Sequence, residues 1–163
     1  MDALFKKLLY VLKEQCNLLD KILNALYKQN EGLRKVDTNA VSASLQQLSA
    51  LSKEMQDLDE KREKIQRELI KTHGMKSNIT ISELITYNIP NEIKNELKQI
   101  KSELDERFNK VKEVNEINAV LIKQVLSVVN TVLNIMKSDV SLTYKPESSK
   151  KQYGFSVLMN KTV

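Results

Sequence analysis

The stretch from Pro90 to Lys137 constrains the fold most, because it contains no Gly or Pro after its first residue. Apolar residues recur along it at alternating spacings of three and four, which is typical of one face of an α-helix. Such a helix is about 70 Å long. A chain of 163 residues cannot enclose that rod in a compact globule, so much of its surface must meet other long helices or a partner. The stripe consists of Ile93, Leu97, Ile100, Leu104, Phe108, Val111, Val114, Asn118, Leu121, Val125, Val128, Val132 and Ile135.

The N-terminal part of the chain predicts a first helix over about residues 2–33. Its apolar residues form a heptad seam, with two interleaved registers at seven-residue spacing. These registers are Phe5, Leu12, Leu19 and Leu26, and Leu9, Cys16 and Leu23. Gly32 stands near the predicted end, and glycine commonly terminates helices because it adopts left-handed backbone angles freely. We therefore expect the first helix to end near Gly32.

Capping residues predict the remaining elements. The run Asp37-Thr38-Asn39 is typical of an N-cap and predicts a second helix over about residues 39–72, which His73-Gly74 ends. Thr80 and Glu83 have the spacing of a capping box, which predicts a short helix before Pro90. The expected fold is all-α, an antiparallel bundle of three long helices plus one short linker helix and an irregular C-terminal tail. We expect residues 1–137 to form the bundle domain and residues 138–163 a flexible C-terminal segment.

Composition and charge exclude several function classes. No run of about 18 uncharged apolar residues occurs, so no stable membrane insertion is expected. A single Cys allows no internal disulfide and fits a reducing, cytoplasmic location. The net charge is +5, but the 26 basic and 21 acidic residues are interspersed, which is typical of solvated helix faces and argues against nucleic-acid binding.

The sequence contains no catalytic constellation. His73 is the only histidine, so no histidine pair or His–Cys dyad can form, and a cation near a helix C-terminus is favoured by the helix dipole. Cys16 occupies a heptad position, where a thiol usually acts as a small core residue. We therefore expect no enzyme activity, no metal site and no cofactor.

Two asparagines on the long helix remain, and two interpretations fit them. Asn118 lies on the apolar stripe, and Asn115 precedes it by about one turn. A buried Asn in a helical seam fixes the register of pairing at some cost in stability. Alternatively, both amides hydrogen-bond a partner, while Leu121, Val125 and Leu126 supply an apolar anchor for a partner helix.

The segment around these asparagines resembles a known family. Asn115, Asn118 and Leu121 resemble the N-x-x-N-x-x-L signature in the long last helix of FlgN-type flagellar export chaperones. Tyr144 after the long helix and the closing run Leu158-Met159-Asn160-Lys161 are similar to that family's C-terminal part. The family's usual glycine after the tyrosine is absent, and Pro146 and Ser148-Ser149 stand there instead.

The resemblance implies a cytoplasmic chaperone of flagellar type III export. Its clients would be the terminal helices of the hook-associated proteins FlgK and FlgL, which it would deliver to the FlhA cytoplasmic domain at the export gate. It implies that Tyr144 docks on the gate and that the client-binding residues are Asn115, Asn118, Leu121, Val125, Leu126 and Val129.

Two rival interpretations stay open at this point. The same stripe fits a structural or scaffold coiled coil that forms a homodimer without an export client. A more distant alternative is a basic helical adaptor on nucleic acid or an anionic membrane, whose binding would weaken steeply with salt.

Overall fold

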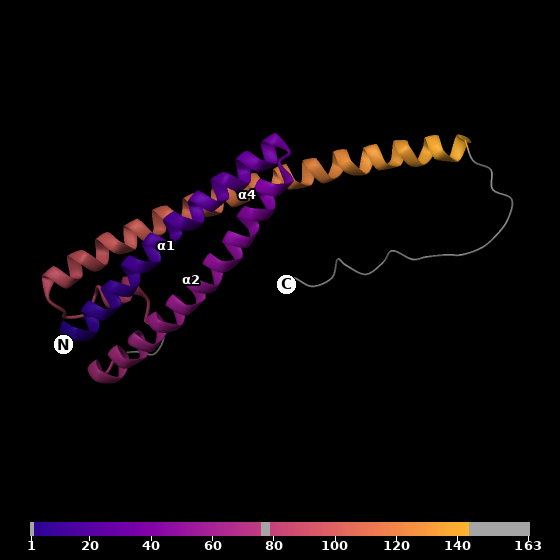
Figure 1. The fold of residues 1–163 in the computed structure, drawn as a ribbon. Coiled ribbons are helices and arrows are strands. Elements are labelled where there is room, and N and C mark those ends of the chain that lie inside the picture. The colour runs from indigo at the N-terminus through magenta and orange to yellow at the C-terminus, as the bar shows by residue number, and fades with distance from the viewer. Residues whose placement is uncertain (1, 76–78, 144–163) are drawn as a thin grey trace, which may run out of the picture. The chain divides into compact units, whose positions relative to one another are not determined.

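The computed structural model describes residues 2–75 and 79–143, with side chains described for residues 3–75 and 79–137. The elements are α1 (Asp2–Lys35), α2 (Thr38–His73), α3 (Ile81–Leu84) and α4 (Asn91–Thr143) (Figure 1). No strand occurs within the described ranges. The predicted all-α fold, with three long helices and one short helix, is confirmed.

The chain divides into two units, Met1–Leu126 and Ser127–Val163. Within the first unit, α1 and α2 form an antiparallel hairpin, in which Gln15 Nε2 donates to Asp59 Oδ1 at 2.8 Å. The first part of α4 then runs parallel to α1, because successive residues of α1 bond successive residues of α4. Lys13 pairs with Glu96, Asp20 with Arg107 and Asn30 with Asn118.

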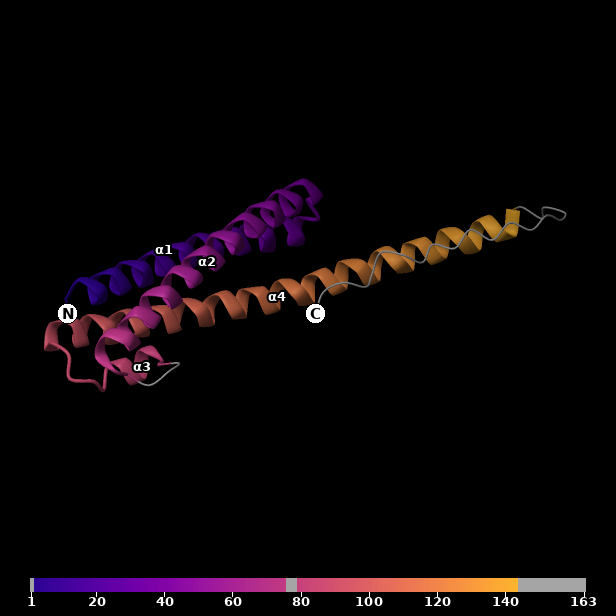
Figure 2. The same cartoon turned by 90° about the horizontal axis from the view of Figure 1, so that it is seen from below.

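The main core lies where all four helices meet, at the beginning of α1 and of α4 and the end of α2 (Figure 2). Its completely buried side chains are Phe5, Leu8 and Leu12 of α1, Leu69 of α2, Leu84 of α3 and Leu97 of α4. Full burial of each such side chain contributes about 1.5–3 kcal/mol before entropy is deducted. A smaller cluster of Leu18, Ala25 and Leu51 joins α1 to α2 farther along the hairpin.

The turn between α1 and α2 corrects the prediction for Gly32. The helix continues through Gly32 to Lys35, and Val36 takes the left-handed conformation with φ 55°. Asp37 N donates to Gly32 O at 2.9 Å and Val36 N to Leu33 O at 3.3 Å, which is the Schellman pattern. Gly32 is needed for close approach instead, because a Cβ there would lie 3.1 Å from Val41 Cγ2 and 3.2 Å from Val41 N.

The other predicted caps are confirmed. Asp37 Oδ1 accepts from Asn39 N at 3.1 Å and Ala40 N at 3.0 Å, which satisfies free N–H groups at the start of α2. Gly74 ends α2 with φ 61°. Thr80 and Glu83 form both halves of a capping box at α3. These local bonds place α3 over the main core, where Leu84 is buried.

The long helix α4 differs from prediction at two points. It extends to Thr143, beyond the predicted end at Lys137. Phe108 is 62% exposed although it belongs to the predicted stripe. Arg107 faces α1 instead, where its Nε lies 3.0 Å from Asp20 Oδ1. The predicted domain boundary and flexible segment 138–163 stay predictions, since residues 144–163 lie outside the described residues.

Candidate interaction surface

The buried stripe of α4 gives way to exposed apolar side chains along the helix. Leu97 and Ile100 are 0% and 4% exposed, whereas most large apolar residues from Val120 to Met136 are about half exposed. We call residues 120–136 the exposed apolar segment of α4. Its exposed large apolar residues are Val120 and Leu126 in the first unit, and Val128, Val129, Val132, Leu133, Ile135 and Met136 in the second.

The apolarity of this segment also bears on the expectation that no stretch of the chain inserts into a membrane. By length and composition alone, α4 has an 18-residue stretch apolar enough to cross a membrane, with a mean hydropathy of 1.6 and none of it buried. The sequence analysis expected no run of about 18 uncharged apolar residues, and this stretch does not contradict it, because it meets a criterion of mean hydropathy and is not such a run. Lys123, Asn130 and Asn134 interrupt the run of apolar residues, but they do not lower its mean hydropathy enough.

Asn118 is buried in the seam between α4 and α1. Its side chain is 1% exposed. Its Nδ2 donates to Leu26 O and to Gln29 Oε1, both at 2.9 Å, and its Oδ1 accepts from Asn30 Nδ2 at 2.7 Å. The amide is therefore satisfied by α1, and a buried amide with specific partners fixes the register of the two helices. This geometry favours the polar-layer interpretation of Asn118.

The other predicted client-binding residues lie at different depths. Asn115 is exposed, one turn before the buried Asn118. Leu121 and Val125 are half-buried. Leu126 and Val129 are 53% and 47% exposed. Tyr144, the predicted gate-docking residue, lies outside the described residues.

Sequence reasoning missed the polar residues of α1 that hold α4. Gln29 is only 3% exposed, and Asn30 bonds both Asn118 and Arg34. A signal for Asn30 was present, because it follows Leu23 by seven residues in the second heptad register. An Asn at a seam position of one helix is a natural partner for an Asn on the stripe of another.

A second polar contact between α1 and α4 lies about three helical turns closer to the main core. Arg107 Nε donates to Asp20 Oδ1 and Oδ2 at 3.0 and 3.1 Å, and this hydrogen bonding raises the pKa of the Arg107 guanidinium above its usual value. Cys16 is 4% exposed nearby, and burial raises the pKa of its thiol. A thiol with a raised pKa is a poor nucleophile, because little of it is thiolate.

His73, the single histidine, has structural partners. His73 Nδ1 lies 3.1 Å from Leu69 O, and the ring packs edge-on against Phe5 with centroids 5.8 Å apart. Within the described ranges, no three His, Cys, Asp or Glu side chains gather closely enough to hold a metal ion.

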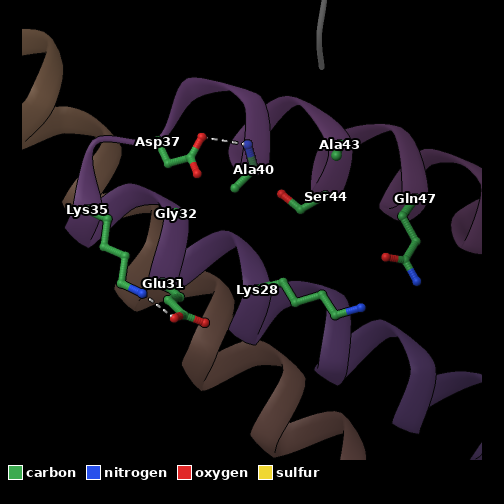
Figure 3. Close-up of a pocket in the computed structure, with 9 residues that line it drawn as sticks. All are labelled: Lys28, Glu31, Gly32, Lys35, Asp37, Ala40, Ala43, Ser44 and Gln47. Carbon is green, nitrogen blue, oxygen red and sulfur yellow. Dashed lines mark hydrogen bonds and ion pairs between the residues drawn. The ribbon is translucent and has the colours of Figure 1, made fainter.

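A polar pocket lies at the turn between α1 and α2 (Figure 3). Its two carboxylates already have partners. Lys35 Nζ donates to Glu31 Oε1 at 2.6 Å, and Asp37 caps α2. A ligand that used either carboxylate would have to break these contacts, so the pocket is explained by the turn.

Fold and surface together define a class, a helical bundle whose last helix presents an apolar surface. The FlgN protein family model matches residues 1–152, and the chain belongs to this family of flagellar export chaperones. No curated protein and no solved structure matches the chain. The resemblance to the FlgN-type family is thereby confirmed.

Proposed function

We propose that this protein is a cytosolic export chaperone for the hook-associated proteins FlgK and FlgL. It binds their terminal helices and delivers them to the FlhA cytoplasmic domain at the export gate. The observation that supports this function most directly is the exposed apolar segment of α4 in a chain of the FlgN family. The proposal includes no enzymatic step, no cofactor, no nucleic acid and no stable membrane insertion.

The physical basis is the pairing of amphipathic helices. A client helix that assembles into a coiled coil after export has an apolar face, which would aggregate in the cytosol. Covering a half-exposed Leu or Val contributes about 1 kcal/mol. Several such side chains give a gain that the cost of association largely offsets, so binding is reversible and needs no nucleotide. Reversibility suits a carrier that must release its client.

The role proposed for each residue of the client surface depends on how exposed its side chain is. In the first unit, Leu126 is exposed and serves as an anchor, while Leu121 and Val125 are half-buried. In the second unit, Val129 is exposed and serves as a further anchor. Asn115 is exposed and can hydrogen-bond the client. Asn118 acts on client binding by holding α4 against α1, since direct contact would require its three hydrogen bonds to break.

Capture of a client peptide tests this surface. Immobilised peptides of the FlgK and FlgL terminal helices should retain the wild-type protein, and Leu126→Asp with Val129→Asp should weaken capture at least about tenfold, because two anchors become charged. Gln124→Asp with Asn130→Asp introduces the same two charges at exposed polar positions nearby and should have little effect. Equal capture by the wild type and the double variant, with helicity unchanged, would remove the basis for this surface.

Gate docking requires a separate experiment. We expect Tyr144→Ala to leave client capture intact and to weaken binding to the FlhA cytoplasmic domain. Loss of both activities in equal measure would contradict this division of roles.

A second function is supported by the same exposed residues. A structural coiled coil would cover the exposed apolar segment with a second copy of the chain. Light scattering with and without the FlgK peptide distinguishes the two. A dimer that persists when the peptide is added favours the scaffold, and replacement of any dimer by a chaperone–client complex favours the chaperone.

A further inference from the structure

A second apolar surface lies on the hairpin of α1 and α2, away from the residues assigned to the client. It is a shallow groove of about 530 Å³ within the first unit. Three residues form an apolar floor, namely Tyr10, Val11 and Ile65, and four lysines border it, namely Lys6, Lys7, Lys61 and Lys64. Tyr10 is 64% exposed, so its ring is accessible to a partner.

The lysines of this groove form no ion pair with the carboxylates that the structure describes. Among the side chains that the structure describes, no carboxylate lies within 4.0 Å of the four ammonium groups. The adjoining cleft differs, since it combines Glu14, Glu54 and Asp57 with Lys21 and Lys61. The one-signed charge is therefore confined to the groove with the apolar floor.

We propose that this groove binds an acidic amphipathic segment of a partner protein. Such a segment places an apolar side chain against Tyr10 and Ile65 and aligns its carboxylates with the lysines on both helices. The apolar floor supplies affinity, while the four charges steer the encounter and set specificity. Charges at the border of a groove remain hydrated, so we expect binding to weaken as salt is added.

Charge complementarity disfavours the other occupants. The chain's own residues 144–163 carry four lysines and a single glutamate, so they would be repelled. A second copy carries a net charge of +5 and lacks a long acidic apolar run. A lipid surface or a nucleic-acid backbone would meet the lysines but leave the concave apolar floor uncovered.

The test uses the full-length protein and a fluorescein-labelled synthetic peptide in which Leu and Phe form one helical face and Asp and Glu the other. Fluorescence anisotropy should show binding that weakens at least about tenfold in Lys7→Glu with Lys64→Glu, which reverses one charge from each helix. Tyr10→Ser should also weaken binding. Lys53→Glu with Lys98→Glu changes the net charge equally at exposed positions outside the groove and should have an effect below about twofold.

Each alternative has a distinct result. A peptide with Ser in place of Leu and Phe should bind poorly, and equal binding would overturn the role of the apolar floor. If Lys53→Glu with Lys98→Glu weakened peptide binding equally, the effect would come from net charge and not from the groove. An unchanged affinity in Lys7→Glu with Lys64→Glu would place the peptide elsewhere, for instance on α4. Tighter lysine-dependent binding of phosphatidylglycerol vesicles or of single-stranded DNA would overturn the protein partner. Unchanged helicity of the variants excludes unfolding as a cause.

Discussion

Replacing Asn118 by Ala should destabilise the first unit substantially. The substitution removes three hydrogen bonds to α1, two donated by Nδ2 and one accepted by Oδ1. It also leaves the side chain of Gln29, which is 3% exposed, without its partner. A buried hydrogen bond contributes about 0.5–1.5 kcal/mol net, so three give a loss of about 2–4 kcal/mol.

Thermal and urea unfolding followed by circular dichroism measure this loss. For a chain of this size, 2–4 kcal/mol corresponds to a decrease in Tm of roughly 5–15 °C. Asn115→Ala is the matched control, because it makes the same change at an exposed site on the same helix. It should shift the free energy of unfolding by less than about 0.5 kcal/mol.

The comparison also separates the two interpretations of the double-Asn motif. Asn115→Ala should weaken client capture while stability is unchanged, whereas Asn118→Ala should act on stability first. If Asn118→Ala costs no more free energy of unfolding than Asn115→Ala, the buried amide does not hold α4 to α1 and the reasoning from its hydrogen bonds is refuted.

Three further predictions concern single residues of the hairpin. Val36→Gly should raise the free energy of unfolding by about 1 kcal/mol in urea titration, because a β-branched residue is strained at φ 55°. As a control, Ala50→Gly in the exposed interior of α2 should lower the free energy of unfolding by about as much. A lower free energy of unfolding for Val36→Gly would show that the turn is not strained. Asp37→Ala should cost about 1 kcal/mol through loss of the N-cap, and an unchanged Tm would contradict the capping role. The raised pKa of Cys16 favours the neutral thiol in the folded state, so its contribution to stability is present below the ordinary thiol pKa and is lost as pH rises through the folded value. Stability should therefore fall more steeply at alkaline pH in the wild type than in Cys16→Ala, and identical pH profiles would argue against this linkage.

Much of the fold could be predicted because its signals are local. The heptad registers of α1 specify which residues face inward, and Phe5 and Leu12 are completely buried. The caps at Asp37, Gly74 and Thr80 depend on side chains within a few residues, so the sequence predicts where α2 and α3 begin or end. The prediction of these caps was confirmed because each cap forms between residues that are close together in the sequence.

The candidate surface was predictable only in part. The stripe on α4 was visible, but periodicity does not state which of its residues the bundle covers. Arg107 and Phe108 both fit a spacing of three to four from Leu104, and the carboxylate of Asp20 selects Arg107 for the seam. Which of Arg107 and Phe108 faces the bundle therefore depends on the side chain of α1 that lies opposite.

The sequence by itself determined the four helices, the caps at Asp37, Gly74 and Thr80 and the excess of apolar residues on α4, since each follows from residue type and spacing along one segment. Only the tertiary structure decided that Asn118 hydrogen-bonds α1, that Gly32 permits close packing while Val36 takes the left-handed turn, and that Leu126 and Val129 are exposed. The partners of Asn118 lie 88 to 92 positions away in the chain. The other outcomes depend on how neighbouring helices pack, and the spacing of residue types along one segment specifies neither.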